Sequence, residues 1–94
     1  TMNSEYKVIL AKTMFEFRHM VIEWNGWVLE VVYGHTDNGW FLAVPNHRFS
    51  LIISEPSDTI YNLGKIFKEC NNETMTLVIT QAIKEDYEEW KKEK

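Results

Sequence analysis

An Asn-Gly pair runs directly into a tryptophan twice in this chain, at Asn25-Gly26-Trp27 and at Asn38-Gly39-Trp40. Asn-Gly is the strongest short-range signal for a β-hairpin, because both residues tolerate the positive φ angles of a tight primed turn. Apolar segments that alternate like strands flank both pairs. The sequence therefore predicts an antiparallel meander rich in aromatic residues.

A chain of 94 residues has room for one hydrophobic core. Its composition, 45% hydrophobic and 26% charged, is that of an ordinary globular domain. The formal net charge of −4 and the pI near 5.3 argue against general binding of nucleic acid or of anionic membranes, which calls for a basic surface. No apolar run approaches the roughly 20 residues that span a bilayer. We expect one domain, residues 1–94, and no membrane association.

The front of the chain is predicted to be strands and the back helices. β-Branched and aromatic residues between turn signals favour strands at 5–11, 14–24, 27–34, 40–44 and 48–54. Apolar residues at helical spacing predict helices at 58–69 and 73–91. The predicted fold class is α+β, a five-stranded antiparallel meander followed by two helices packed on one face in two layers.

The two turns also predict a register. A two-residue turn at Asn25-Gly26 makes three pairs on one core-facing side: Trp24 with Trp27, Ile22 with Leu29, and Met20 with Val31. The second turn, taken at Asn38-Gly39, pairs Tyr33 with Val44 and puts Trp40 on the same side. Large residues change from odd to even positions between Phe17 and Met20, which predicts a β-bulge near Arg18-His19.

The reverse side of the sheet is unusually apolar for a surface in water. It carries Val21, Val28, Val32, Phe41 and Ala43. Scattered apolar residues are common on exposed sheets, so a purely structural explanation is open. The functional interpretation is a surface for a protein partner or for self-association, formed by Val21, Val28, Val32 and Phe41.

Catalytic and metal-binding groups are sparse. The three histidines and Cys70 lack the close spacing of zinc ligands, so no metal site and no cofactor are expected. Cys70 continues the apolar stripe of its helix and is expected to pack as a small hydrophobe. His35 and Asp37 at the second hairpin tip could receive a ligand, although turn chemistry also explains them. We predict no catalytic residues and no enzymatic activity.

The last predicted helix carries an acidic run, Glu85, Asp86, Glu88 and Glu89. Such a run could imitate a nucleic-acid backbone or attract a basic partner. Lysines three or four residues away compensate much of its charge, which favours an ordinary solvated helix surface.

Short motifs in the second half carry a resemblance to a known family. They are the segment Phe41 to Asn46 with Pro45, the segment Ser57 to Asn62, and the segment Thr76 to Glu85. Over roughly residues 40–86 the chain resembles an uncharacterised family of short proteins, about 90 residues long, from Gram-positive bacteria, often carried by phages or conjugative elements. The resemblance implies a small accessory protein acting in the bacterial cytoplasm and supplies no catalytic residues.

Three functions remain open from the sequence. We favour a non-enzymatic protein-binding or inhibitory accessory protein that acts on a host factor through the reverse face of its sheet. The first alternative is a structural homodimer without ligand. The second is a small-ligand-binding domain whose pocket is lined by Trp24, Trp27 and Trp40. The single cysteine and the absence of a secretory signal pattern at the start of the sequence favour a cytoplasmic location.

Overall fold

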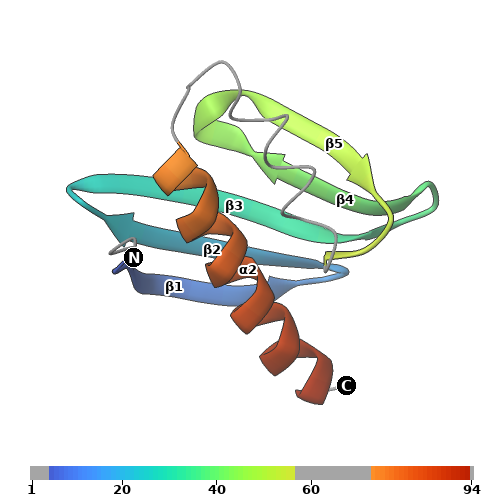
Figure 1. The fold of residues 1–94 in the computed structure, drawn as a ribbon. Helices are drawn as coiled ribbons and strands as arrows, with labels where there is room; N and C mark the ends of the chain where they lie inside the picture. Colours follow the sequence, from blue (N-terminus) through green and yellow to red (C-terminus); the bar gives the residue numbers. More distant parts are fainter. Residues whose placement is uncertain (1–4, 57–72, 94) are drawn as a thin grey trace.

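The computed structural model describes residues 5–56 and 73–93, which form one antiparallel sheet with a long helix across it (Figure 1). The strands are β1 (Lys7–Met14), β2 (Phe17–Trp24), β3 (Trp27–Thr36), β4 (Gly39–Val44) and β5 (Phe49–Ile53), with a short 3₁₀ helix, η1 (Pro45–His47), between the last two. The helix is α2 (Glu73–Glu93). Neighbouring strands pair in the order β1-β2-β3-β4-β5, so every connection is to the next strand.

The α+β class, the five-stranded meander and the C-terminal helix are confirmed. The strand-like β-branching at the start of α2 does not prevent helix formation, because its apolar stripe is buried against the sheet. The predicted helix at 58–69 lies outside the described residues.

The first hairpin has the predicted turn and register. Asn25 and Gly26 have φ angles of 49° and 81°, as a primed two-residue turn requires. Trp24 pairs with Trp27, and the register is regular back to Phe17 opposite Gly34. The even-numbered residues of β2 therefore face α2.

The second hairpin differs from the prediction by two positions. Tyr33 pairs with Leu42, and Thr36 with Gly39, so the turn residues are Asp37 and Asn38. The Thr36 hydroxyl accepts the Asn38 N–H at 3.1 Å and donates to the Gly39 carbonyl at 3.0 Å. Gly39 supplies the positive φ, 116°, just after the turn. The predicted pairing of Tyr33 with Val44 is wrong, but a shift of two keeps each side chain on its predicted face.

The predicted bulge near Arg18-His19 is also wrong. Strand β2 pairs regularly with both neighbours through these residues, and the irregularity lies in β1, between Val8 and Leu10. Phe15 is not a strand residue, because it occupies the β1–β2 turn with a φ of 56°. The predicted strand 14–24 is interrupted by this turn, so the side chains of β2 alternate regularly from Phe17 to Trp24 without a bulge.

The core lies between the sheet and α2. Strands contribute Met20, Ile22, Leu29, Val31, Tyr33, Leu42 and Val44, and the helix contributes Met75, Val78, Ile79, Ala82, Ile83 and Trp90, all at most 3% exposed. Of the three tryptophans predicted to share the core side, Trp24 is buried and Trp40 packs partly against the core. Trp27 points to the same side but is 52% exposed.

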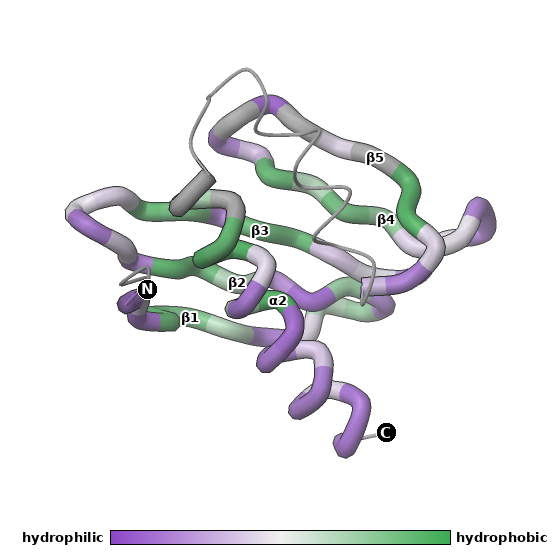
Figure 2. The backbone as a smooth tube through the Cα atoms, viewed as in Figure 1, coloured by the Kyte–Doolittle hydropathy of each residue, from purple (hydrophilic) through white to green (hydrophobic). Residues whose placement is uncertain are grey.

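Hydropathy follows this division (Figure 2). Hydrophobic stretches fall on the strands and on part of α2, whereas the C-terminal turns of α2 are hydrophilic. One side of the sheet is thus closed by α2. We call this side the inner face and the opposite side the outer face.

Candidate functional site

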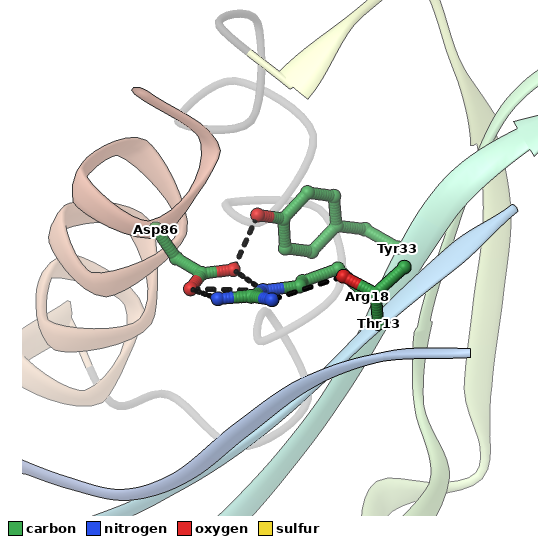
Figure 3. A network of polar contacts seen from close by, with 4 residues as sticks. All are labelled: Thr13, Arg18, Tyr33 and Asp86. Carbon is green, nitrogen blue, oxygen red and sulfur yellow. Dashed lines mark hydrogen bonds and ion pairs between the residues drawn. The ribbon is translucent and has the colours of Figure 1, made fainter. Parts of the chain in front are cut away.

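A largely buried ion pair joins α2 to the inner face. The Arg18 guanidinium donates to both carboxylate oxygens of Asp86, with Nε at 2.9 Å from Oδ2 and Nη2 at 3.0 Å from Oδ1 (Figure 3). The Tyr33 hydroxyl donates to the same carboxylate at 2.6 Å, and Arg18 Nη1 donates to the Thr13 hydroxyl at 3.0 Å. The side chains of Arg18 and Asp86 are 12% and 9% exposed. Three strands are thereby connected to one helix residue.

The network perturbs its own acid–base groups. Hydrogen bonding to Asp86 raises the pKa of Arg18, against the opposing effect of burial. Burial, followed by donation to the Asp86 carboxylate, raises the pKa of Tyr33 above its ordinary value. Arg18 stays charged and Tyr33 stays neutral at physiological pH, which suits a fixed structural joint rather than proton transfer.

A second contact ties the start of β1 to α2. The Tyr6 hydroxyl donates to Glu85, whose other oxygen accepts from Gln81 Nε2 at 2.8 Å. Burial and then the contact with Glu85 raise the pKa of Tyr6, while hydrogen bonds from Tyr6 and Gln81 lower the pKa of Glu85. These groups also serve to position the helix.

Aromatic rings fill the end of the inner face near the β3–β4 turn. Trp40 stacks edge-on against Tyr87 and Trp90, with ring centroids 5.7 and 6.2 Å apart. Trp24 and Trp27 lie at the opposite end of β3, about 25 Å away at about 3.3 Å per strand residue. The structure does not bring these three tryptophans together around one pocket.

The outer face carries the predicted partner surface. Val21, Val28, Val32 and Phe41 alternate with core residues, and the register places all four on this face. Val28 is 53% exposed, while the other three are partly buried by their neighbours on the sheet. Leu10, Met14 and Ile52 share the face and are 42%, 49% and 50% exposed.

Two phenylalanines meet across a glycine on the outer face. Phe17 and Phe41 stack edge-on, with centroids 6.0 Å apart, on either side of Gly34. A Cβ at Gly34 would lie 2.2 Å from the Glu16 carbonyl oxygen. The absence of a side chain at Gly34 therefore allows the β1–β2 turn to lie against β3, where the His35 N–H donates to that oxygen at 3.3 Å.

This turn displays Phe15, whose side chain is 100% exposed. Beside it is a pocket of about 320 Å³ lined, among the described residues, by Met14, Phe15, Phe17, His19, Glu30 and Val32. The polar groups in the pocket are a pair: His19 Nε2 lies 3.7 Å from Glu30 Oε1, and their side chains are 19% and 41% exposed. His19 Nε2 is buried and has no hydrogen-bond partner among the described residues. We call this hollow the outer pocket.

The two residues predicted from the sequence to receive a ligand, His35 and Asp37, are not part of the outer pocket. His35 is exposed and packs edge-on against Trp40 at 5.5 Å, and Asp37 is exposed in the β3–β4 turn. Cys70 lies outside the described residues, as does the side chain of His47. Within residues 5–56 and 73–93, no three His, Cys, Asp or Glu side chains gather as metal ligands would.

The acidic run is divided between an exposed side of α2 and the side that faces the sheet. Glu88 and Glu89 form exposed ion pairs with Lys91 and Lys92, at 3.8 and 3.7 Å. Asp86 points to the sheet, so its assignment to a solvated helix surface is wrong. The reason is that Asp86 meets a cation on β2, 68 residues away in sequence.

Phe15, His19 and Glu30 were missed as candidate site residues. Phe17 and His19 share odd positions with Val21, and this parity is the signal of the outer face. Phe15 gives no such signal, because it lies in the β1–β2 turn and not in a strand.

The fold and the outer pocket define a small α+β domain with one sheet face closed by a helix and one apolar face carrying a polar pair. The chain belongs to a family of unknown function (DUF6618), whose family model matches residues 2–91. Neither a curated protein nor a solved structure matches the chain. In the described part of the chain, no helix combines the length and the apolarity that crossing a bilayer requires.

Proposed function

We propose that the chain is a non-enzymatic protein-binding domain and that the outer face of its sheet is the binding surface. The observation that carries the proposal is Phe15. Its ring is fully exposed and its backbone has a positive φ, which costs a non-glycine residue about 1–2 kcal/mol. A phenylalanine held in this way contributes nothing to the packing of the isolated chain.

A partner protein gives these features a use. Burying a phenylalanine side chain contributes about 1.5–3 kcal/mol, and aromatic anchors dominate the binding energy of protein interfaces. Exposed apolar residues continue this surface along the outer face, from Met14 next to the turn to Leu10 and Val28 farther along the sheet. The inner face is packed against α2, although Trp27 on that face is 52% exposed.

Site-specific photo-crosslinking tests the proposal. A benzoylphenylalanine replaces Val28 on the outer face, and a matched variant carries it at Leu77, which is 42% exposed on α2. In cells of the source organism we expect Val28 to yield a discrete adduct with another protein and Leu77 to yield none. The same adducts from both positions, or none from Val28, would contradict the proposal. Self-adducts alone would instead establish the homodimer.

The structure also selects the variant that should abolish the adduct. Phe41 packs against Phe17, so a charge there would disturb the fold. Met14 lies on the outer face, lines the outer pocket and is 49% exposed. Met14→Lys should remove the Val28 adduct while leaving the thermal unfolding midpoint within a few degrees, since surface substitutions rarely exceed about 0.5 kcal/mol.

A further inference from the structure

We propose that the outer pocket binds an arginine side chain of the partner protein. The inference rests on the proposed function, since it specifies what the partner presents to the outer face. Its starting point is the chemistry of the pocket: Met14, Phe15, Phe17 and Val32 form apolar walls around the polar pair His19 and Glu30.

The polar pair offers hydrogen-bond acceptors to an occupant of the pocket. The Glu30 carboxylate is an acceptor with no lysine or arginine ion pair among the described residues, where its ion-pair neighbour is His19 at 3.7 Å. His19 Nε2 is buried without a hydrogen-bond partner among the described residues, and it accepts a hydrogen bond in the tautomer that carries its proton on Nδ1. An apolar occupant would desolvate Glu30 and leave both groups unpaired, which is unfavourable. A cationic donor satisfies both.

The apolar walls distinguish arginine from lysine. A guanidinium is planar, more weakly hydrated than an ammonium, and stacks on aromatic rings. The exposed ring of Phe15 offers a face for stacking, and Glu30 offers a carboxylate for a two-pronged hydrogen bond. The three-carbon stem of arginine would lie along Met14 and Val32.

The size of the pocket agrees with a single side chain. A volume of about 320 Å³ is at the lower end of the roughly 300–1,000 Å³ of small-molecule sites. The overall charge of −4 adds a long-range attraction for a basic partner segment. Arginine is also among the residues that most often supply the energetic centre of an interface.

The test uses N-acetyl-arginine amide as the probe and N-acetyl-citrulline amide as its uncharged isostere. Both are titrated into the full chain to tens of millimolar while ¹H–¹⁵N spectra are recorded. The arginine probe should give saturable shifts confined to residues of the outer pocket. The citrulline probe should bind about fivefold more weakly, because a charge-assisted hydrogen bond is about twice as strong as a neutral one. N-acetyl-lysine amide should bind more weakly than the arginine probe.

A matched pair of variants locates the effect. Glu30→Gln should remove the preference for arginine over citrulline, whereas Glu23→Gln, at another exposed glutamate on the outer face, should leave it unchanged. Equal binding of both probes, no saturable shift, or shifts centred on Glu88 and Glu89 of α2 would overturn the inference. A Val28 crosslink without arginine binding would contradict the arginine inference and leave the proposed protein-binding function supported. Arginine binding without a Val28 crosslink would show that the pocket recognises arginine but would contradict the proposed function.

Discussion

Gly34 is the residue at which the backbone of the sheet leaves no room for a side chain. A Cβ there would lie 2.2 Å from the Glu16 carbonyl oxygen and 2.8 Å from the Phe17 Cα. Both are backbone atoms, so the neighbour cannot yield by changing a rotamer. The position of the β1–β2 turn, and with it the outer pocket, depends on this close approach.

Gly34→Ala should therefore destabilise the fold by about 2–3 kcal/mol, the upper part of the range for overpacking. Urea denaturation measures the loss. Gly26→Ala is the control, because Gly26 has a φ of 81° but nothing within 4 Å of its Cβ position, so it reports backbone strain alone at about 1 kcal/mol. A Gly34→Ala variant no less stable than Gly26→Ala would contradict the steric account.

The β1–β2 turn is an element in which stability and the proposed function oppose each other. Phe15→Gly should stabilise the free chain by about 0.5–1 kcal/mol, because relief of the positive-φ strain exceeds the entropic cost of glycine. The same variant should lose the Val28 crosslink, since the aromatic anchor is gone. Urea denaturation and crosslinking are the two measurements. A destabilised Phe15→Gly variant would show that the exposed ring supports the fold.

The two Asn-Gly turns show how far local sequence determines an element. At Asn25-Gly26 both turn residues take positive φ, so the turn alone determines the register of the first hairpin. At the second pair the Thr36 hydroxyl bonds to Asn38 and Gly39, which moves the turn one residue towards the N-terminus. A side chain that competes for backbone groups is not visible in a turn dipeptide.

The outer face was predictable and the outer pocket was not. Val21, Val28 and Val32 follow from the parity of the first hairpin, because a two-residue side-chain period leaves no choice of face. The pocket depends on where β1 ends and β2 begins. That boundary is set by the approach of Glu16 to Gly34, a contact between segments distant in sequence.

Pro45 and Asn46, which follow the end of β4, have a structural role at the edge of β3. Strand β4 leaves the first half of β3 without a partner on that side, since their pairing begins at Val32. The Asn46 side chain bonds to this edge of β3 where β4 does not. The side-chain amide of Asn46 donates to the Val28 carbonyl at 2.8 Å, and its side-chain oxygen accepts the Glu30 N–H at 3.4 Å. The motif therefore satisfies a strand edge beside the outer face.

At the scale of the whole molecule, the junction of α2 with the sheet depends on contacts that no local pattern predicts. The apolar stripe of α2 predicts that the helix packs on a face of the sheet. The Arg18–Asp86 pair joins residues 68 positions apart and fixes where along the face the helix lies. An acidic residue among three other carboxylates gives no sign in the sequence that it will be buried.

Asp86→Asn should reduce the free energy of unfolding by about 3 kcal/mol, because it keeps the shape of the side chain but leaves the guanidinium of Arg18 buried without a counter-ion. The loss is large against the roughly 5–15 kcal/mol of a typical domain. Glu88→Gln is the matched control: its ion pair with Lys91 is exposed, and removing it should cost at most about 0.5 kcal/mol. Urea denaturation of both variants gives the comparison.

The double variant Arg18→Met/Asp86→Leu, measured by urea denaturation, shows how much the ion pair contributes to the free energy of unfolding. Apolar residues of similar size can replace a buried ion pair with little loss, so the double variant should be more stable than Asp86→Asn alone. Tyr33 would then lose its acceptor, and burial of its unpaired hydroxyl sets the remaining cost at about 1–3 kcal/mol. If Asp86→Asn were as mild as Glu88→Gln, hydrophobic packing by Ile79, Ile83 and Trp90 would suffice to hold the helix, and the ion pair would contribute nothing to the joint.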